Sequence, residues 1–277
     1  MRLLRYVLLL TPIMVWGQET YTNATNSNTA IDQYLQSFSQ VDDVDSPVPD
    51  ISGFVQKLQN RDNTKSNFKF CRILFQKTRQ EFLRRYAQYA SFSETLQTGT
   101  YNCLTGTALY ALLLDHFDIP YTIIETNYHI FLLASTAEGP VLFEATDPVY
   151  GFVTDPEKIE RRIQEYKTNA TEMPADGREY YRYEASLYRQ VDLNQLQGLL
   201  HYNVSIEAYN KQDFPSAIHH LDEAFDLYNS PRISEFSAIL LRALLDSNLE
   251  QQIKGLYIDR VQSIRKKLPV MANRSSR

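Results

Sequence analysis

The feature that most constrains the fold is a change of hydrophobic pattern at Pro120. Before it, apolar residues recur at helical spacing in three segments, residues 29–40, 66–90 and 103–117. After it come three short runs of β-branched and aromatic residues, 121–126, 128–135 and 140–147. A glycine-containing link at residues 136–139 joins the last two runs and predicts a hairpin. Helices followed by antiparallel strands predict an α+β fold.

A second, all-helical domain is predicted after the strands. A polar helix over residues 156–168 leads to a tyrosine-rich stretch over 180–188, whose rings we expect to pack one domain on the other. From Asp192 onward the chain has a helical pattern, with a break at residues 229–231. The predicted division is a first domain over residues 29–178, a helical domain over 179–268 and a flexible tail over 269–277.

The N-terminus has the pattern of an export signal. Arg2 and Arg5 precede an apolar stretch over residues 6–16, which Gly17-Gln18 follows. This stretch is shorter than the about 20 residues that a membrane-spanning helix needs. We therefore expect residues 1–17 to be removed, residues 18–28 to form a disordered leader, and the mature chain to be periplasmic or secreted without stable membrane insertion.

Composition and motifs exclude several classes of function. The net charge is −5 and no long basic run occurs, which argues against a nucleic-acid partner. Nucleotide-binding glycine motifs and the metal motifs C-x-x-C and H-E-x-x-H do not occur either. His219 and His220 are adjacent, so they point to different helix faces and are expected to be solvated. No metal and no cofactor is expected.

Three kinds of side chain could form a reactive site. Cys103 opens a predicted helix with Asn102 as its N-cap, and the helix N-terminus stabilises a thiolate. His129 lies within an apolar strand, where a basic side chain is worth desolvating only if it has a partner. Glu144 and Asp147 follow on the facing strand, and either carboxylate could fix the imidazole tautomer. Nucleophile, base and orienting acid are then all present.

The segments around these residues resemble the transglutaminase-like superfamily, which has the papain-like cysteine hydrolase fold. The matching segments are Tyr101-Asn102-Cys103-Leu104-Thr105-Gly106, Asp118-Ile119-Pro120, Tyr128-His129-Ile130-Phe131 and Val141-Leu142-Phe143-Glu144-Ala145-Thr146. The resemblance implies a catalytic triad of Cys103, His129 and Glu144. The family's usual tripeptide is Asp-Pro-Thr. Its trailing threonine favours Glu144 as the acid and leaves Asp147 as the alternative.

The resemblance also implies an activity. Papain-like enzymes place a glutamine before the cysteine to donate to the oxyanion, and Gln97 is the candidate here. The implied reaction is cysteine-dependent hydrolysis or acyl transfer on peptide or isopeptide amides, without a cofactor. The substrate would be a peptide or a protein.

Other readings of the same residues stay open. Cys71 and Cys103 could form a disulfide, because two cysteines in an exported protein commonly pair, and such a bond could act as a redox switch. Cys103 could instead be an inert buried thiol beside a satisfied core histidine. The alternative function is a catalytically silent scaffold whose helical domain binds an envelope protein.

Residues 198–231 resemble a tetratricopeptide repeat. The matching apolar positions are Tyr202, Ile206, Ala217, Leu221 and Ala224, around a turn at 210–214. Ser205 and Ala208 replace the usual glycine and tyrosine of the first helix. About three repeats are usually needed for an independent array, so this module is expected to rest on the first domain. It would either stabilise that domain or offer a docking surface to a protein partner.

Overall fold

The computed structural model describes residues 23–42, 47–61, 68–168, 187–228 and 230–267. Within these residues the chain is α+β, which confirms the predicted fold class. The predicted signal peptide, the first part of the leader, most of the tyrosine-rich stretch and the tail lie outside the described residues. None of the described helices is long and apolar enough to cross a membrane.

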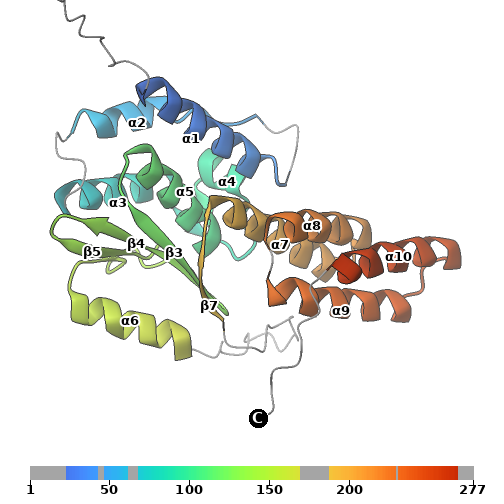
Figure 1. Ribbon diagram of the computed structural model, residues 1–277. Coiled ribbons are helices and arrows are strands. Elements are labelled where there is room, and N and C mark those ends of the chain that lie inside the picture. Colours follow the sequence, from blue (N-terminus) through green and yellow to red (C-terminus); the bar gives the residue numbers. More distant parts are fainter. Residues whose placement is uncertain (1–22, 43–46, 62–67, 169–186, 229, 268–277) are drawn as a thin grey trace, which may run out of the picture.

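Helix α5 (Cys103–His116) lies at the centre of the first domain (Figure 1). Its sequence is apolar on all sides, which is typical of a helix that is buried all round. Leu109, Tyr110 and Leu113 are fully buried. The surrounding helices are α1 (Asn23–Ser39), α2 (Ser52–Gln59), α3 (Phe68–Phe82) and the short α4 (Phe92–Gln97).

A five-stranded antiparallel sheet packs against α5. Its strands, in spatial order, are β6 (Phe152–Val153), β5 (Gly139–Phe143), β4 (Ile130–Thr136), β3 (Tyr121–Thr126) and β7 (Tyr188–Val191). The predicted hairpin is confirmed, because β4 pairs with β5 around Thr136 and Gly139. A separate parallel pair joins β1 (Arg85–Tyr86) to β2 (Thr100–Tyr101).

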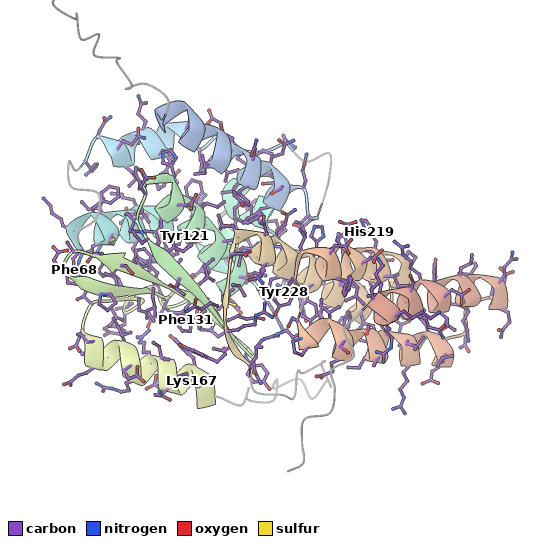
Figure 2. All side chains as sticks on the ribbon, in the orientation of Figure 1. Phe68, Tyr121, Phe131, Lys167, His219 and Tyr228 are labelled. Carbon is purple, nitrogen blue, oxygen red and sulfur yellow. The ribbon has the colours of Figure 1, made fainter. Side chains whose placement is uncertain are left out.

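Both faces of the sheet are buried. Neighbouring residues of a strand point to opposite faces, so Leu132 packs in the core with α5 while Phe131 packs on the other side. There, helix α6 (Pro156–Thr168) covers the sheet with Ile159 and Ile163. Figure 1 shows α6 under the sheet, opposite the other helices, and Figure 2 labels Phe131 between sheet and α6.

The C-terminal helices project to one side of the sheet (Figure 1). They are α7 (Leu193–Asn210), α8 (Phe214–Leu227), α9 (Pro231–Asp246) and α10 (Gln251–Lys267). Helix α7 packs against both α8 and α5, so the helical domain shares a core with the first domain. Tyr228, labelled in Figure 2, lies at this junction.

Several predicted boundaries are wrong. The helix predicted over 66–90 ends at Phe82, because the backbone amides of Arg84 and Arg85 turn to the Gly99 carbonyl and begin β1. Helix α1 begins at Asn23, within the predicted leader, since residues 23–28 continue the helix anchored by the buried segment after them. Strand β7 pairs with β3, although its residues were assigned to the helical domain.

Three smaller expectations also need correction. His129 was placed inside a strand, but β4 begins only at Ile130, so His129 is the last residue of the preceding turn. Glu144 likewise follows β5, which ends at Phe143. His220 is buried against α7 rather than solvated.

Candidate active site

Cys103 is the first residue of α5, as predicted, and Asn102 is the N-cap. The Asn102 side chain accepts a hydrogen bond from the Thr105 amide at 2.9 Å, and the Thr105 hydroxyl accepts one from the Asn102 amide at 3.1 Å. The side-chain nitrogen of Asn102, Nδ2, also donates to the backbone carbonyls of Gln88 and Ala90. This buried network fixes the end of the helix, so that the partly exposed thiol has a defined position.

His129 is held by the turn between β3 and β4. The backbone amide of Thr126 donates to the His129 carbonyl at 2.8 Å, and the His129 amide donates to the Thr126 hydroxyl at 3.1 Å. One residue further, the Ile130 carbonyl accepts a hydrogen bond from Thr107 of α5 at 3.2 Å. The turn is therefore tied both to its own strand and to the helix that Cys103 opens.

Glu144 accepts four hydrogen bonds although it is only 2% exposed. One carboxylate oxygen, Oε1, accepts from the Thr146 amide at 2.9 Å and from the Thr146 hydroxyl at 2.6 Å. The other, Oε2, contacts His129 Nε2 and accepts from the Tyr166 hydroxyl at 3.0 Å. These hydrogen bonds replace those that the carboxylate would make to water, so they offset the free-energy cost of burying its charge.

Two glycines allow these elements to approach each other. A Cβ on Gly106, one turn into α5, would lie 2.7 Å from the Ala145 Cβ. A Cβ on Gly151 would lie 2.2 Å from the Glu144 carbonyl oxygen and 2.3 Å from that of Asp147. The missing side chain at Gly106 lets the glutamate loop pack against α5, and the missing side chain at Gly151 lets that loop fold back on itself.

The electrostatics of the three side chains are coupled. Burial lowers the pKa of His129, but hydrogen bonds to Cys103 and Glu144, together with their negative charges, raise it to about 10. Burial opposes ionisation of Glu144, yet the hydrogen bond and charge of His129 and the bonds from Thr146 hold the pKa of Glu144 below its usual range. At neutral pH His129 is therefore an imidazolium and Glu144 a carboxylate.

Helix α6 contributes a residue that the sequence analysis missed. Tyr166 donates its hydroxyl to Glu144, and its ring lies 4.7 Å from the His129 ring between centroids. The phenol thus shields the bond between His129 and Glu144 from water. In the sequence Tyr166 is one aromatic residue in a polar helix, and nothing there indicates a partner. Its contact with Glu144 arises only because α6 packs on the sheet.

The two other predicted candidates lie in different surroundings. Asp147 accepts from the backbone amides of Val149 and Tyr150 and pairs with Arg162 at 2.8 Å. Gln97 lies at the end of α4, where its amide nitrogen donates to Ser93 Oγ at 2.8 Å and contacts the Pro47 carbonyl. The structure therefore brings Glu144, not Asp147, to His129, and the oxyanion role of Gln97 stays a prediction.

Tyr86 lies in β1, which pairs with β2 just before α5 begins. It pairs with Tyr101 in the β1–β2 ladder, and the two rings are 6.1 Å apart between centroids. The residue is 57% exposed, and partial burial, followed by the negative charge of Cys103, raises the pKa of Tyr86 to about 12. The phenol therefore keeps its proton at neutral pH.

The disulfide reading does not agree with the structure, in which Cys71 and Cys103 are both free. Cys71 is fully buried within the core, and burial raises the pKa of its thiol to about 12. Among the described residues, no group of three or more histidine, cysteine and acidic side chains is arranged to hold a metal ion.

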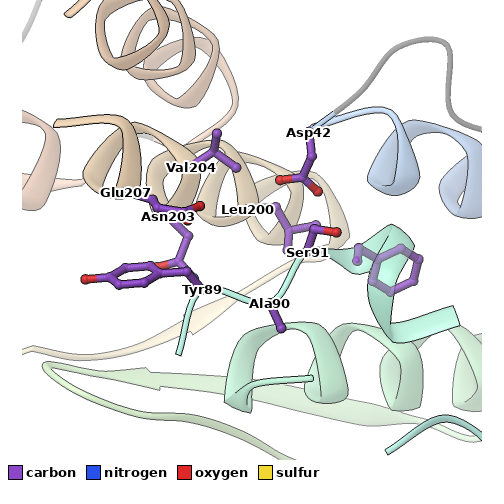
Figure 3. Close-up of a pocket in the computed structure, with 9 residues that line it drawn as sticks. Asp42, Tyr89, Ala90, Ser91, Leu200, Asn203, Val204 and Glu207 are labelled. Carbon is purple, nitrogen blue, oxygen red and sulfur yellow. The ribbon is translucent and has the colours of Figure 1, made fainter. Parts of the chain in front are cut away.

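A pocket lies where α7 faces the chain just before α4 (Figure 3). Its lining residues are Asp42, Tyr89, Ala90, Ser91, Phe92, Leu200, Asn203, Val204 and Glu207. Cys103, His129 and Glu144 do not line it, so it is a feature of the junction between the domains. It borders the segment that Asn102 holds through the Ala90 carbonyl.

Comparison with known proteins adds no family assignment. No protein-family model, no curated protein and no solved structure matches this chain.

Proposed function

We propose that this protein is a cysteine-dependent hydrolase or acyltransferase of the transglutaminase-like type, acting on peptide or isopeptide amides. The observation that carries the proposal is the contact of His129 Nε2 with the buried carboxylate of Glu144, in the domain whose central helix begins at Cys103; the hydrogen bond and charge of Cys103 also help to raise the pKa of His129. A helix-leading cysteine, an imidazole and a buried orienting acid are the parts of a nucleophilic site. The arrangement of helices on an antiparallel sheet agrees with the papain-like fold that this type of enzyme has.

In the proposed reaction, His129 holds the proton that the Cys103 thiol has given up. The thiolate sulfur attacks the carbonyl carbon of the amide, and the negative charge moves to the carbonyl oxygen. The backbone N–H of Cys103, at the start of α5, stabilises that oxygen. As the C–N bond breaks, His129 gives its proton to the leaving amine, and a thioester remains on Cys103.

The thioester is resolved by water or by a second amine. His129, now neutral, accepts a proton from the attacking group as the new bond to the carbonyl carbon forms. Glu144 keeps the imidazole oriented and stabilises its protonated form in both halves of the reaction. The departing acyl product restores the thiolate.

The helical domain supports a more modest proposal. Helices α7 and α8 form an antiparallel pair around the turn predicted from the resemblance to a tetratricopeptide repeat. Because α7 shares the core of the first domain, we propose that the module stabilises the site-bearing domain.

Alkylation of Cys103 tests the proposed function directly. The rate of iodoacetamide labelling is measured between pH 5 and pH 9 by mass spectrometry, for the native chain and for His129→Ala. We expect fast labelling at pH 6 that falls about a hundredfold in the variant, because an unassisted thiol is almost wholly protonated there. Peptide and isopeptide libraries then identify the amide that is cleaved or exchanged.

The matched control is His219→Ala, because His219 is exposed on α8 and outside the site. This variant should label like the native chain. Slow labelling at pH 6 that does not respond to His129→Ala would contradict the proposal and favour a silent scaffold.

A further inference from the structure

An arginine of the helical domain reaches the turn that carries His129. Arg232, in the first turn of α9, donates through Nη2 to the backbone carbonyls of Thr126 and Asn127, the latter at 2.7 Å. Its Nε lies 3.0 Å from Oε1 of Glu125. These contacts join residues about a hundred positions apart in the chain, and the Arg232 side chain is only 13% exposed.

The carboxylate that Arg232 meets is itself buried. The Glu125 side chain is 3% exposed, and its Oε1 also accepts a hydrogen bond from the hydroxyl of Tyr228, at the end of α8. On the other side, Arg189 of β7 lies 3.8 Å from Oε2. Arg232 is the nearer of the two arginines, so losing it removes the main compensation for this buried charge.

The arginine contacts lie next to the bonds that hold His129. Thr126 accepts from Arg232 through its carbonyl, while its amide and hydroxyl make the hydrogen bonds to His129. The planar guanidinium contacts a carboxylate and two successive carbonyls at once, so it fixes the orientation of that peptide segment. A change of about 1 Å in the position of a reacting group can lower a rate a hundredfold.

We propose that Arg232 is a positioning residue for His129, so that the helical domain completes the reactive site of the first domain. The inference rests on the proposed function, since it concerns the same imidazole. It adds that α9 holds the end of β3 and the first residue of the turn, residues 125–127, in the conformation that places His129 against Glu144. The helical domain is then a part of the catalytic unit.

The test uses full-length protein and a variant that separates geometry from buried charge. Arg232→Met alone leaves Glu125 without its main partner and destabilises the fold. The double variant Glu125→Gln with Arg232→Met removes both charges, so we expect it to fold. The control is Arg260→Met, which breaks an ion pair between Arg260 and Asp222 inside the same domain.

Three quantities are measured on each variant. They are the thermal midpoint, the rate of iodoacetamide labelling of Cys103 from pH 5 to pH 9, and amide hydrogen exchange of the peptide over residues 126–130. In the double variant we expect labelling at pH 6 to fall at least about tenfold and exchange in this peptide to accelerate. Arg260→Met should change neither. Arg232→Lys keeps the positive charge but loses the planar, forked guanidinium. Its thermal midpoint should therefore be closer to the native value than its labelling rate is.

The outcomes separate the two proposals. Native labelling and native exchange in a folded double variant would overturn the role of Arg232 while leaving the proposed function intact. If the double variant does not fold, Arg232→Lys decides, and native labelling in that variant overturns the inference. If labelling of the native chain ignores His129→Ala, the proposed function fails and the inference falls with it.

Discussion

Glu144 and Asp147 belong to the same loop, but they differ in burial and in the groups that they contact. Glu144 is buried and contacts His129, Tyr166 and Thr146. Asp147 is partly exposed, and hydrogen bonds from the Tyr150 and Val149 amides and from Arg162 hold its pKa below the usual range although burial opposes this. The first carboxylate orients the imidazole, and the second stabilises the loop.

A pair of isosteric substitutions tests this division. Glu144→Gln removes the charge that stabilises the His129 imidazolium, so labelling of Cys103 at pH 6 should fall about a hundredfold. Asp147→Asn keeps the site and should change this rate less than about threefold, while the loss of its ion pair costs up to about 1 kcal/mol of stability. The two labelling rates and the urea midpoints are the measurements. A larger kinetic effect in Asp147→Asn would reverse the assignment of the acid.

At the level of elements, the site depends on how closely the glutamate loop approaches α5. Gly106 sits in the first turns of that helix against Ala145, the residue after Glu144. Glycine is unfavourable inside a helix by about 1 kcal/mol relative to alanine. Its presence here is explained by the contact, since any Cβ would push the loop away from the helix.

Two identical substitutions in different helices measure this effect. Gly106→Ala should destabilise the fold by roughly 1–3 kcal/mol through overpacking and slow Cys103 labelling by displacing Glu144. Gly255→Ala, in α10 with nothing within 4 Å of the new methyl group, should stabilise by up to about 1 kcal/mol and leave labelling unchanged. Equal stability changes in the two variants, measured by urea unfolding, would contradict the close-approach argument.

For the whole molecule, stability should depend on pH through a buried histidine pair. His201 Nδ1 and His220 Nδ1 lie 3.1 Å apart between α7 and α8, so one ring donates and the other accepts. Burial, followed by the charge of neighbouring histidines, lowers the pKa of both to about 4, and Asp213 only partly opposes this for His220. His219 is one of the neighbouring histidines whose charge lowers the pKa of both rings.

The sign of the effect follows from the two states. The unfolded chain takes up protons at these rings near pH 6.5, whereas the folded chain takes them up only near pH 4. The pair therefore contributes its full stability above pH 6.5 and loses it as the pH falls from 6.5 toward 4. We expect this loss to be roughly 2–3 kcal/mol for each of the two rings in the native chain.

Urea unfolding at pH 7, 5.5 and 4 measures this loss. His220→Gln keeps a hydrogen-bonding group without a proton to gain, so its stability should decline less over the same interval. Parallel declines in the native chain and the variant would exclude the histidine pair as the cause.

Much of the local structure could be predicted from the sequence, because local rules decide it. Asn102 caps the helix that Cys103 opens, β3 spans residues 121–126 as predicted, and α6 spans residues 156–168. Periodicity, capping residues and turn residues act over a few positions, so they can be read along the chain. The order of cysteine, histidine and acid was visible for the same reason.

The choice among partners was decided only in three dimensions. The sequence left Glu144 and Asp147 as rival acids and Cys71 as a disulfide partner, and it gave no sign of Tyr166 or Arg232. Tyr166 reaches Glu144 because α6 packs under the sheet, and Arg232 reaches the Asn127 carbonyl because α9 packs beside it. Contacts between residues far apart in the chain depend on which faces the tertiary structure buries together, and no local pattern encodes that pairing.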